Sequence, residues 1–90
     1  MLNQVVLVGR IVTDIEPTNS DNENEFTFKL SITNKDEEKI SSDIIPIITR
    51  FVDIRNYCGK HDLIGIKGKI EMIDNKVNVI AQKATFLSTK

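Results

Sequence analysis

Lysine and arginine side chains occupy alternate positions in several β-rich segments of this 90-residue chain. Lys67 and Lys69 are two residues apart in one segment, Lys29 takes the same outward phase in another, and Arg50 follows a third. Because alternate residues of a strand project from one face, such cations can contact a series of phosphates. Four contacts with a single-stranded nucleic acid, each releasing about 0.7 of a counterion, would make the logarithm of the binding constant fall with the logarithm of salt concentration with a slope near −3. The alternative is that these side chains are ordinary solvated charges, which prevent edge-to-edge aggregation of strands.

The chain offers little for catalysis or for metal binding. Cys58 is the one cysteine and His61 the one histidine. Their spacing would allow a thiol–imidazole pair, but Cys58 has the phase of a helix face that packs into the core, a common position for a free cysteine. The two do not form a recognisable metal set, and neither a phosphate-binding glycine loop nor a nucleophile motif is present. We therefore expect a protein that is not an enzyme and holds no metal or cofactor.

The apolar pattern predicts five strands and one short helix as the scaffold for these cations. The predicted strands are residues 2–12, 26–33, 43–49, 63–71 and 76–86. Pro46 implies an edge position or a bulge, and Asp74-Asn75 predict a tight turn. Between the third and fourth strands the period becomes helical, and Gly59 is placed to end the helix. The order β-β-β-α-β-β predicts an all-β chain with one short helix, a five-stranded OB-fold barrel in a single domain over residues 1–90.

The first strand is apolar on both of its faces. Val5 and Leu7 lie on one face, and Val6 and Val8 on the other. A chain this short has little else with which to cover a second face, so we expect Val6 and Val8, with the nearby Asn3, to contact another subunit. The alternative is a closed barrel with isolated surface valines, which are common.

The five aromatic residues are predicted to lie in the core. Phe26, Phe28 and Phe86 have the inward phase of their strands, whereas Phe51 and Tyr57 lie on the apolar face of the predicted helix. This assignment leaves few rings to stack on nucleic-acid bases. Phe51, which follows the third strand, is the one aromatic residue that we keep as a candidate for contact with a base.

Several segments together resemble the bacterial single-stranded-DNA-binding protein family. These are residues 2–11 (LNQVVLVGRI), 14–17, 28–33 (FKLSIT), 43–48 (DIIPII), 56–57, 60, 63–70 (LIGIKGKI), 81 and 86–87. The resemblance covers nearly the whole chain, and the order and spacing of the segments carry it. The form without a flexible acidic tail is similar to the primosomal replication protein N, a dimeric relative.

The resemblance implies an OB-fold that pairs through its first strands into a homodimer or two such dimers. It also implies binding of single-stranded DNA with little sequence preference, in replication, repair or recombination, and contact with replication proteins. The candidate DNA-binding residues are Lys29, Arg50, Phe51, Lys67, Lys69, Arg10, Lys39 and Lys76. The last two lie near loops that border the groove of an OB-fold.

The sequence departs from the family pattern in ways that favour a second hypothesis. There is no Trp, the turn at residues 72–75 is short, and the loop after the first strand carries the acidic Asp21, Glu23 and Glu25. The alternative is therefore an OB-fold adaptor of a primosome or mobile element with weak or no affinity for DNA.

Composition is consistent with an intracellular protein. The chain has 12 basic and 13 acidic residues, a net charge of −1, so any basic face must be offset by an acidic one. A single cysteine, no signal sequence and no apolar segment that could span a bilayer predict a cytoplasmic protein without membrane association.

Overall fold

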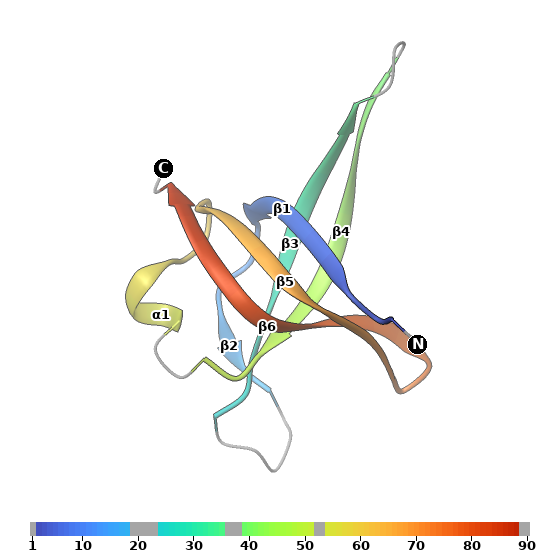
Figure 1. Cartoon of the computed structure of the whole chain (residues 1–90). Helices are drawn as coiled ribbons and strands as arrows, with labels where there is room; N and C mark the ends of the chain where they lie inside the picture. Colours follow the sequence, from blue (N-terminus) through green and yellow to red (C-terminus); the bar gives the residue numbers. More distant parts are fainter. Residues whose placement is uncertain (1, 19–23, 36–38, 52–53, 89–90) are drawn as a thin grey trace.

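A single β-sheet that closes on itself organises the chain (Figure 1). The computed structural model describes residues 2–18, 24–35, 39–51 and 54–88. Within these ranges the elements are β1 (Val5–Ile11), β2 (Glu16–Pro17), β3 (Phe26–Lys35), β4 (Ile40–Thr49), α1 (Ile54–Tyr57), β5 (Leu63–Ile73) and β6 (Lys76–Ser88). The five long strands form the barrel, and α1 lies between the third and fourth of them. This is the OB-fold arrangement predicted from the sequence.

Two short ladders close the barrel. β1 pairs with β5 along most of its length, from Val5 to Arg10. The first short ladder joins the end of β1 to β3, at Arg10 and Ile11. On the other side, β4 and β6 run parallel and pair over three residues of each strand, Ile47–Thr49 with Val79–Ala81. All other pairings are antiparallel. Pro46 was predicted at an edge or a bulge; β4 is an interior strand and Pro46 pairs with Lys29 of β3, but it lies just outside the β4–β6 ladder, so the strand is unpaired on that side.

The core follows the predicted alternation of the strands. Phe28, Leu30, Ile47, Ile64 and Ile66 are each at most 2% exposed and belong to one cluster. The turn at Asp74-Asn75 is also confirmed, with φ values of 52° and 64° that suit Asp and Asn in a two-residue hairpin turn.

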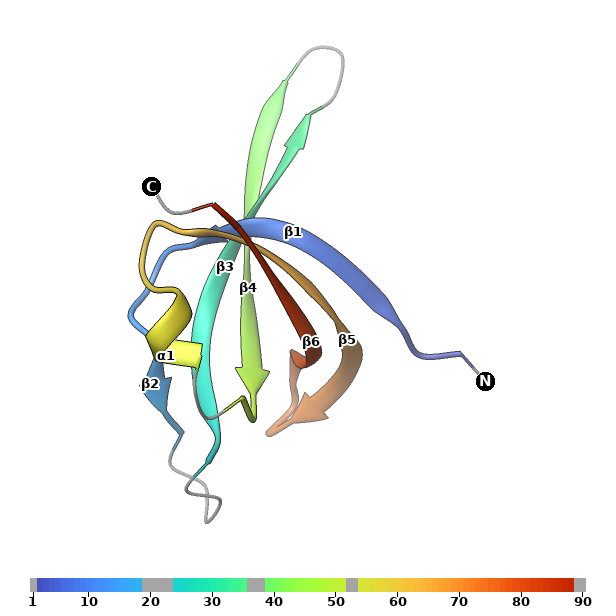
Figure 2. The ribbon, with the colours of Figure 1, turned by 60° about the vertical axis from the view of Figure 1, so that its left-hand side comes forward.

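Polar stretches predicted as loops are partly strand. β3 and β4 continue as a hairpin through residues predicted to be loop, with Thr33 opposite Ser42 and Lys35 opposite Ile40. Figure 2 shows this hairpin projecting beyond the barrel. Both of its faces meet solvent there, so its residues need not be apolar. In the loop after β1, Glu16–Pro17 pair with Phe26 and Thr27 as β2.

Three aromatic side chains predicted to be buried are exposed. Tyr57 is 61%, Phe86 46% and Phe51 38% exposed. α1 is a single turn, so one of its residues, Ile54, reaches the core. Phe86 has the inward phase, opposite the buried Ile64, but it lies near the end of β6, where the barrel opens. The prediction for these rings was wrong because periodicity gives the face of a residue and not its depth.

We predict that Gly68→Ala destabilises the protein strongly. A Cβ atom at this position would overlap the backbone carbonyl oxygen of Ile80, next to the register shift between β5 and β6. Backbone atoms in a ladder cannot move aside, so we expect a loss of about 1–3 kcal/mol or more in the free energy of unfolding, measured by urea denaturation. Gly59→Ala is the control, because nothing lies within 4 Å of its added Cβ. Equal stability of the two variants would contradict the packing described for Gly68.

Candidate nucleic-acid interface

A row of outward-facing residues crosses four strands of the barrel. Lys69 on β5 is opposite Ile80 on β6, Ile80 is level with Ile48 on β4, and Ile48 is opposite Thr27 on β3. Ile48 and Ile80 are both 8% exposed but lie outside the core cluster, since their neighbours along each strand point inward. Ile48 and Ile80 form an apolar floor. We call these two residues, together with Thr27 and Lys69, the outer row.

Lys29 lies beside the outer row in a hollow of about 450 Å³. It is two residues from Thr27 on β3 and opposite Pro46, and its backbone N–H donates to the Thr13 hydroxyl over 2.9 Å. Lys60 lines the same hollow, a cation that the sequence analysis missed because it follows the helix. Asp14 and Glu16 line it too, so its positive charge is partly offset.

Arg50 is held by an acidic partner from the loop before β3. Its guanidinium lies 3.3 Å from the Glu25 carboxylate, which also accepts a hydrogen bond of 2.9 Å from the Thr18 hydroxyl. The Glu25 side chain is 12% exposed and that of Arg50 65%. The acidic loop therefore acts on the candidate site through a direct ion pair between Glu25 and Arg50. Asp21 and Glu23 lie outside the described residues.

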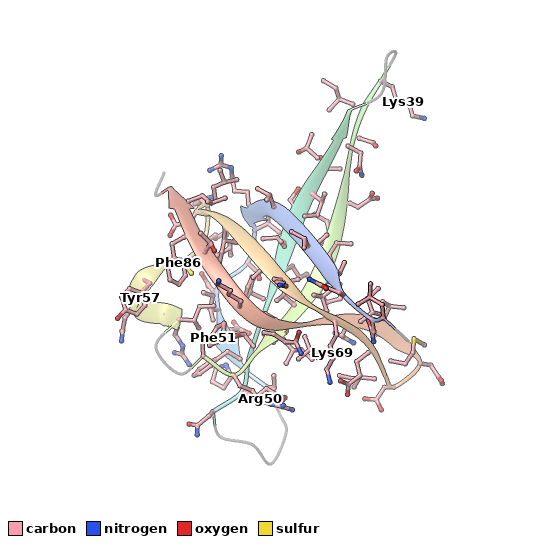
Figure 3. All side chains as sticks on the ribbon, viewed as in Figure 1. Lys39, Arg50, Phe51, Tyr57, Lys69 and Phe86 are labelled. Carbon is pink, nitrogen blue, oxygen red and sulfur yellow. The ribbon has the colours of Figure 1, made fainter. Side chains whose placement is uncertain are left out.

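The other predicted cations are dispersed over the molecule. Lys69 makes a long ion pair of 3.7 Å with Glu71. Arg10 donates to the His61 carbonyl over 2.7 Å at the corner where β1 meets both β3 and β5. Lys76 begins β6 next to the turn. Figure 3 shows Lys39 at the far tip of the β3–β4 hairpin, whereas Arg50, Phe51 and Lys69 lie toward the other end of the molecule.

Lys67 lies on the face predicted to contact another subunit. It is flanked by Val6 on β1 and Lys83 on β6, and the next row is Val8, Gly65 and Thr85. Val6, Val8 and Leu87 are exposed and line a shallow groove of about 310 Å³. The two sequence predictions, DNA contact by Lys67 and subunit contact by Val6, therefore concern the same surface.

Asn3, also predicted at the subunit contact, has a role within the chain. Its side-chain amide donates to the Ile70 carbonyl over 2.9 Å, and the Ile70 N–H donates to its Oδ1 over 3.0 Å. The amide thus continues the β1–β5 ladder beyond Val5 and covers part of the β5 edge.

The exposed aromatic residues gather around α1. The rings of Tyr57 and Phe86 stack with centroids 5.5 Å apart and planes 21° apart. The Arg55 guanidinium lies 4.6 Å from the centre of the Phe26 ring. The sequence analysis placed these rings in the core; the signal that could have shown their exposure was the position of Gly59, which leaves room for only a short helix.

Cys58 is unsuited to nucleophilic chemistry. Burial, with a smaller contribution from Asp62, raises the pKa of its thiol to about 11, so the protonated form dominates at neutral pH. Its Sγ donates to the Ile54 carbonyl over 3.6 Å. The described ranges contain no group of three or more His, Cys, Asp or Glu side chains placed to hold a metal ion. No helix within those ranges is long and apolar enough to cross a membrane.

Solved structures with the same architecture are numerous. Rim1, the mitochondrial single-stranded DNA-binding protein of S. cerevisiae, matches with a TM-score of 0.81 and 12% identity over 100% of both chains. The SSB of Plasmodium falciparum, solved with ssDNA, matches at 0.77 and 18% over 98% of this chain and 97% of that one. The dimeric N-terminal domain of PriB from Thermoanaerobacter tencongensis matches at 0.71 and 19%, over 97% and 98%.

The chain has the OB-fold of the SSB and PriB proteins. The resemblance predicted from the sequence is thus confirmed in the structure over the full length of the chain. No protein-family model matches the chain, and no curated protein matches it in sequence. At these identities the likeness shows the fold alone, and function has to be argued from the surface.

We predict that Glu25→Gln strengthens binding to polyanions. The substitution removes the charge that holds Arg50 and leaves the guanidinium available. We expect the variant to elute from a heparin column at higher salt than the parent protein. Asp43→Asn is the control, since it changes net charge equally but lies on the β3–β4 hairpin, where its carboxylate accepts from Asn34. Equal retention of both variants would show that the Arg50–Glu25 pair does not limit anion binding.

Proposed function

We propose that this protein binds single-stranded DNA without catalysing a reaction and with little sequence preference, in cytoplasmic DNA replication, repair or recombination. The observation that carries the proposal is the outer row, an apolar floor of Ile48 and Ile80 with Lys69 at one end and Lys29 beside the other. It lies across β3 and β4, the second and third long strands, whose outer face binds oligonucleotides in OB-folds. The likeness to single-stranded DNA-binding proteins supports it.

The outer row suits a ligand with a charged backbone and apolar faces. Lys29 and Lys69 would contact phosphates, and bases would lie over the isoleucine floor, a contact that does not depend on the identity of the base. The row offers no set of side-chain amides for reading base edges. Because Lys67 lies on another surface, three cations remain, Lys29, Lys69 and Arg50, and the expected salt slope is about −2.

The test is a fluorescence-anisotropy titration of labelled oligo-dT of about 30 nucleotides, a length that spans two or more OB-folds, at low and near-physiological salt. We expect binding to the single strand, steep weakening with salt and little binding to a duplex of equal length. Lys29→Glu with Lys69→Glu should weaken binding at least tenfold. Lys39→Glu should have little effect, because Lys39 lies at the hairpin tip (Figure 3). Absence of binding at low salt, or equal loss in the control, would overturn the proposal.

A protein-interaction adaptor is the second candidate. Two of the three cations at the site already have acidic partners, Glu25 for Arg50 and Glu71 for Lys69, which favours low affinity for DNA. Under this hypothesis oligo-dT would not bind, and the glutamate variants would still capture replication proteins.

We further infer that two chains pair through the exposed face of β1. Val6 and Val8 on β1 and Leu87 on β6 are exposed apolar side chains that the chain itself does not cover, in a groove that Lys67 and Lys83 also line. The PriB domain with the same fold is dimeric. A second chain on this face would bury the valines and raise the stability of a small domain.

We predict that Val8→Glu dissociates this dimer, as measured by light scattering at micromolar concentration. Each carboxylate would lose its hydration on burial beside Val6 and Leu87 of the interface. Val77→Glu is a matched control, because Val77 is 53% exposed and Val8 54%, but Val77 lies on the β5–β6 hairpin. A parent protein with the mass of one chain would rule out the dimer, and a mass of four chains would show a second interface between dimers.

A further inference from the structure

Tyr57 and Phe86 form an exposed aromatic stack that the fold does not require. Both rings were expected in the core, yet Tyr57 is 61% and Phe86 46% exposed. They come from the end of α1 and the end of β6, and they meet at 5.5 Å (Figure 3). One ring pair therefore presents a large flat apolar surface to water in a chain with five aromatic residues in all.

The surroundings of the stack are suited to a phosphate backbone. α1 has no acidic residue in its first turn and carries the exposed Arg55. Phe51 and Arg50 precede α1, and the Ile54 N–H donates to the Phe51 carbonyl over 3.1 Å, which fixes this segment at the start of the turn. Aromatic rings and arginines thus alternate around α1, as in surfaces that track a single strand by stacking and charge.

The stack is also placed to extend the outer row. Arg50 and Phe51 follow directly on β4, two and three residues beyond Ile48 of the floor. In Figure 3, Phe51 lies between Lys69 and the Tyr57–Phe86 pair, and Arg50 lies below them. Because Ile80 faces outward and Phe86 has the inward phase of β6, a strand that leaves the floor past Arg50 would cross the rim of the barrel to reach the stack.

We propose that the Tyr57–Phe86 stack is a second binding site for single-stranded DNA, which takes an unpaired base on its exposed ring face beyond the outer row. This inference rests on the proposed function and adds a stacking device that the outer row lacks. The base would extend the existing stack, and the exposed Arg55 on α1 would offset the charge of the adjoining phosphate.

The composition of the chain gives a direct readout. Tyr57 is the only tyrosine and the chain has no Trp, so the intrinsic near-ultraviolet emission comes from Tyr57. A base stacked on the ring should quench this emission. We would titrate the protein with unlabelled oligo-dT at low salt, follow Tyr57 emission, and measure binding in parallel by anisotropy of labelled oligo-dT. An abasic oligonucleotide of equal length tests charge without bases, and free tyrosine amide corrects for absorption by DNA.

We expect quenching by oligo-dT that saturates with binding, and none with the abasic strand. Tyr57→Ala should weaken binding about fivefold or more, and Tyr57→Phe, which keeps the ring, should not. Because the side chain is mostly exposed, circular dichroism should show both variants folded. Binding with unchanged emission, or unchanged affinity in Tyr57→Ala, would overturn the stacking site and leave the outer row standing. No binding by anisotropy would overturn the proposed function and this site with it.

Discussion

The parallel ladder between β4 and β6 is the constraint on which the surface of this protein depends. It spans three residues of each strand, and it joins segments about 30 residues apart in the sequence. Without it the sheet would remain open, and Ile48 would not lie level with Ile80. The same pairing that directs Ile47 and Val79 into the core directs Ile48 and Ile80 outward. Closure of the barrel and formation of the outer row are therefore one event, and a register error of one residue would exchange floor for core.

Charge at the site is set by local pairs rather than by the total. The net charge is −1, and Arg50 and Lys69 each have a carboxylate within 4 Å. The two pairs differ in kind. Lys69 and Glu71 are both about half exposed and 3.7 Å apart, so their pair contributes little and yields readily to a phosphate. Glu25 is mostly buried and fixed by Thr18, so Arg50 exchanges it at a higher cost. A ligand therefore gains Lys69 more easily than Arg50.

Much of the fold could be predicted from local patterns, and the site could be predicted only in part. Alternation identifies Phe28 and Leu30 as core because the period of a strand is a local property. Asp74-Asn75 specify their own turn. The burial of Ile48 and Ile80 depends on pairing between distant segments, and the exposure of Phe86 depends on where the barrel ends. Neither is encoded within a window of the chain, so outward cations were predicted as one set although the barrel divides them between surfaces.

β5 shows how one strand serves two surfaces. Lys67 is flanked by Val6, but β1 ends its ladder at Gly68, so Lys69 lies beyond β1 and joins the outer row. The register shift between β5 and β6 falls at the same place, and a bulge there increases the local twist and turns the strand. Gly68 allows this because no side chain would fit against Ile80. The face proposed to contact a second chain and the outer row proposed to bind DNA are thus successive stretches of one strand. A change that moves β5 to suit one face must also alter the other.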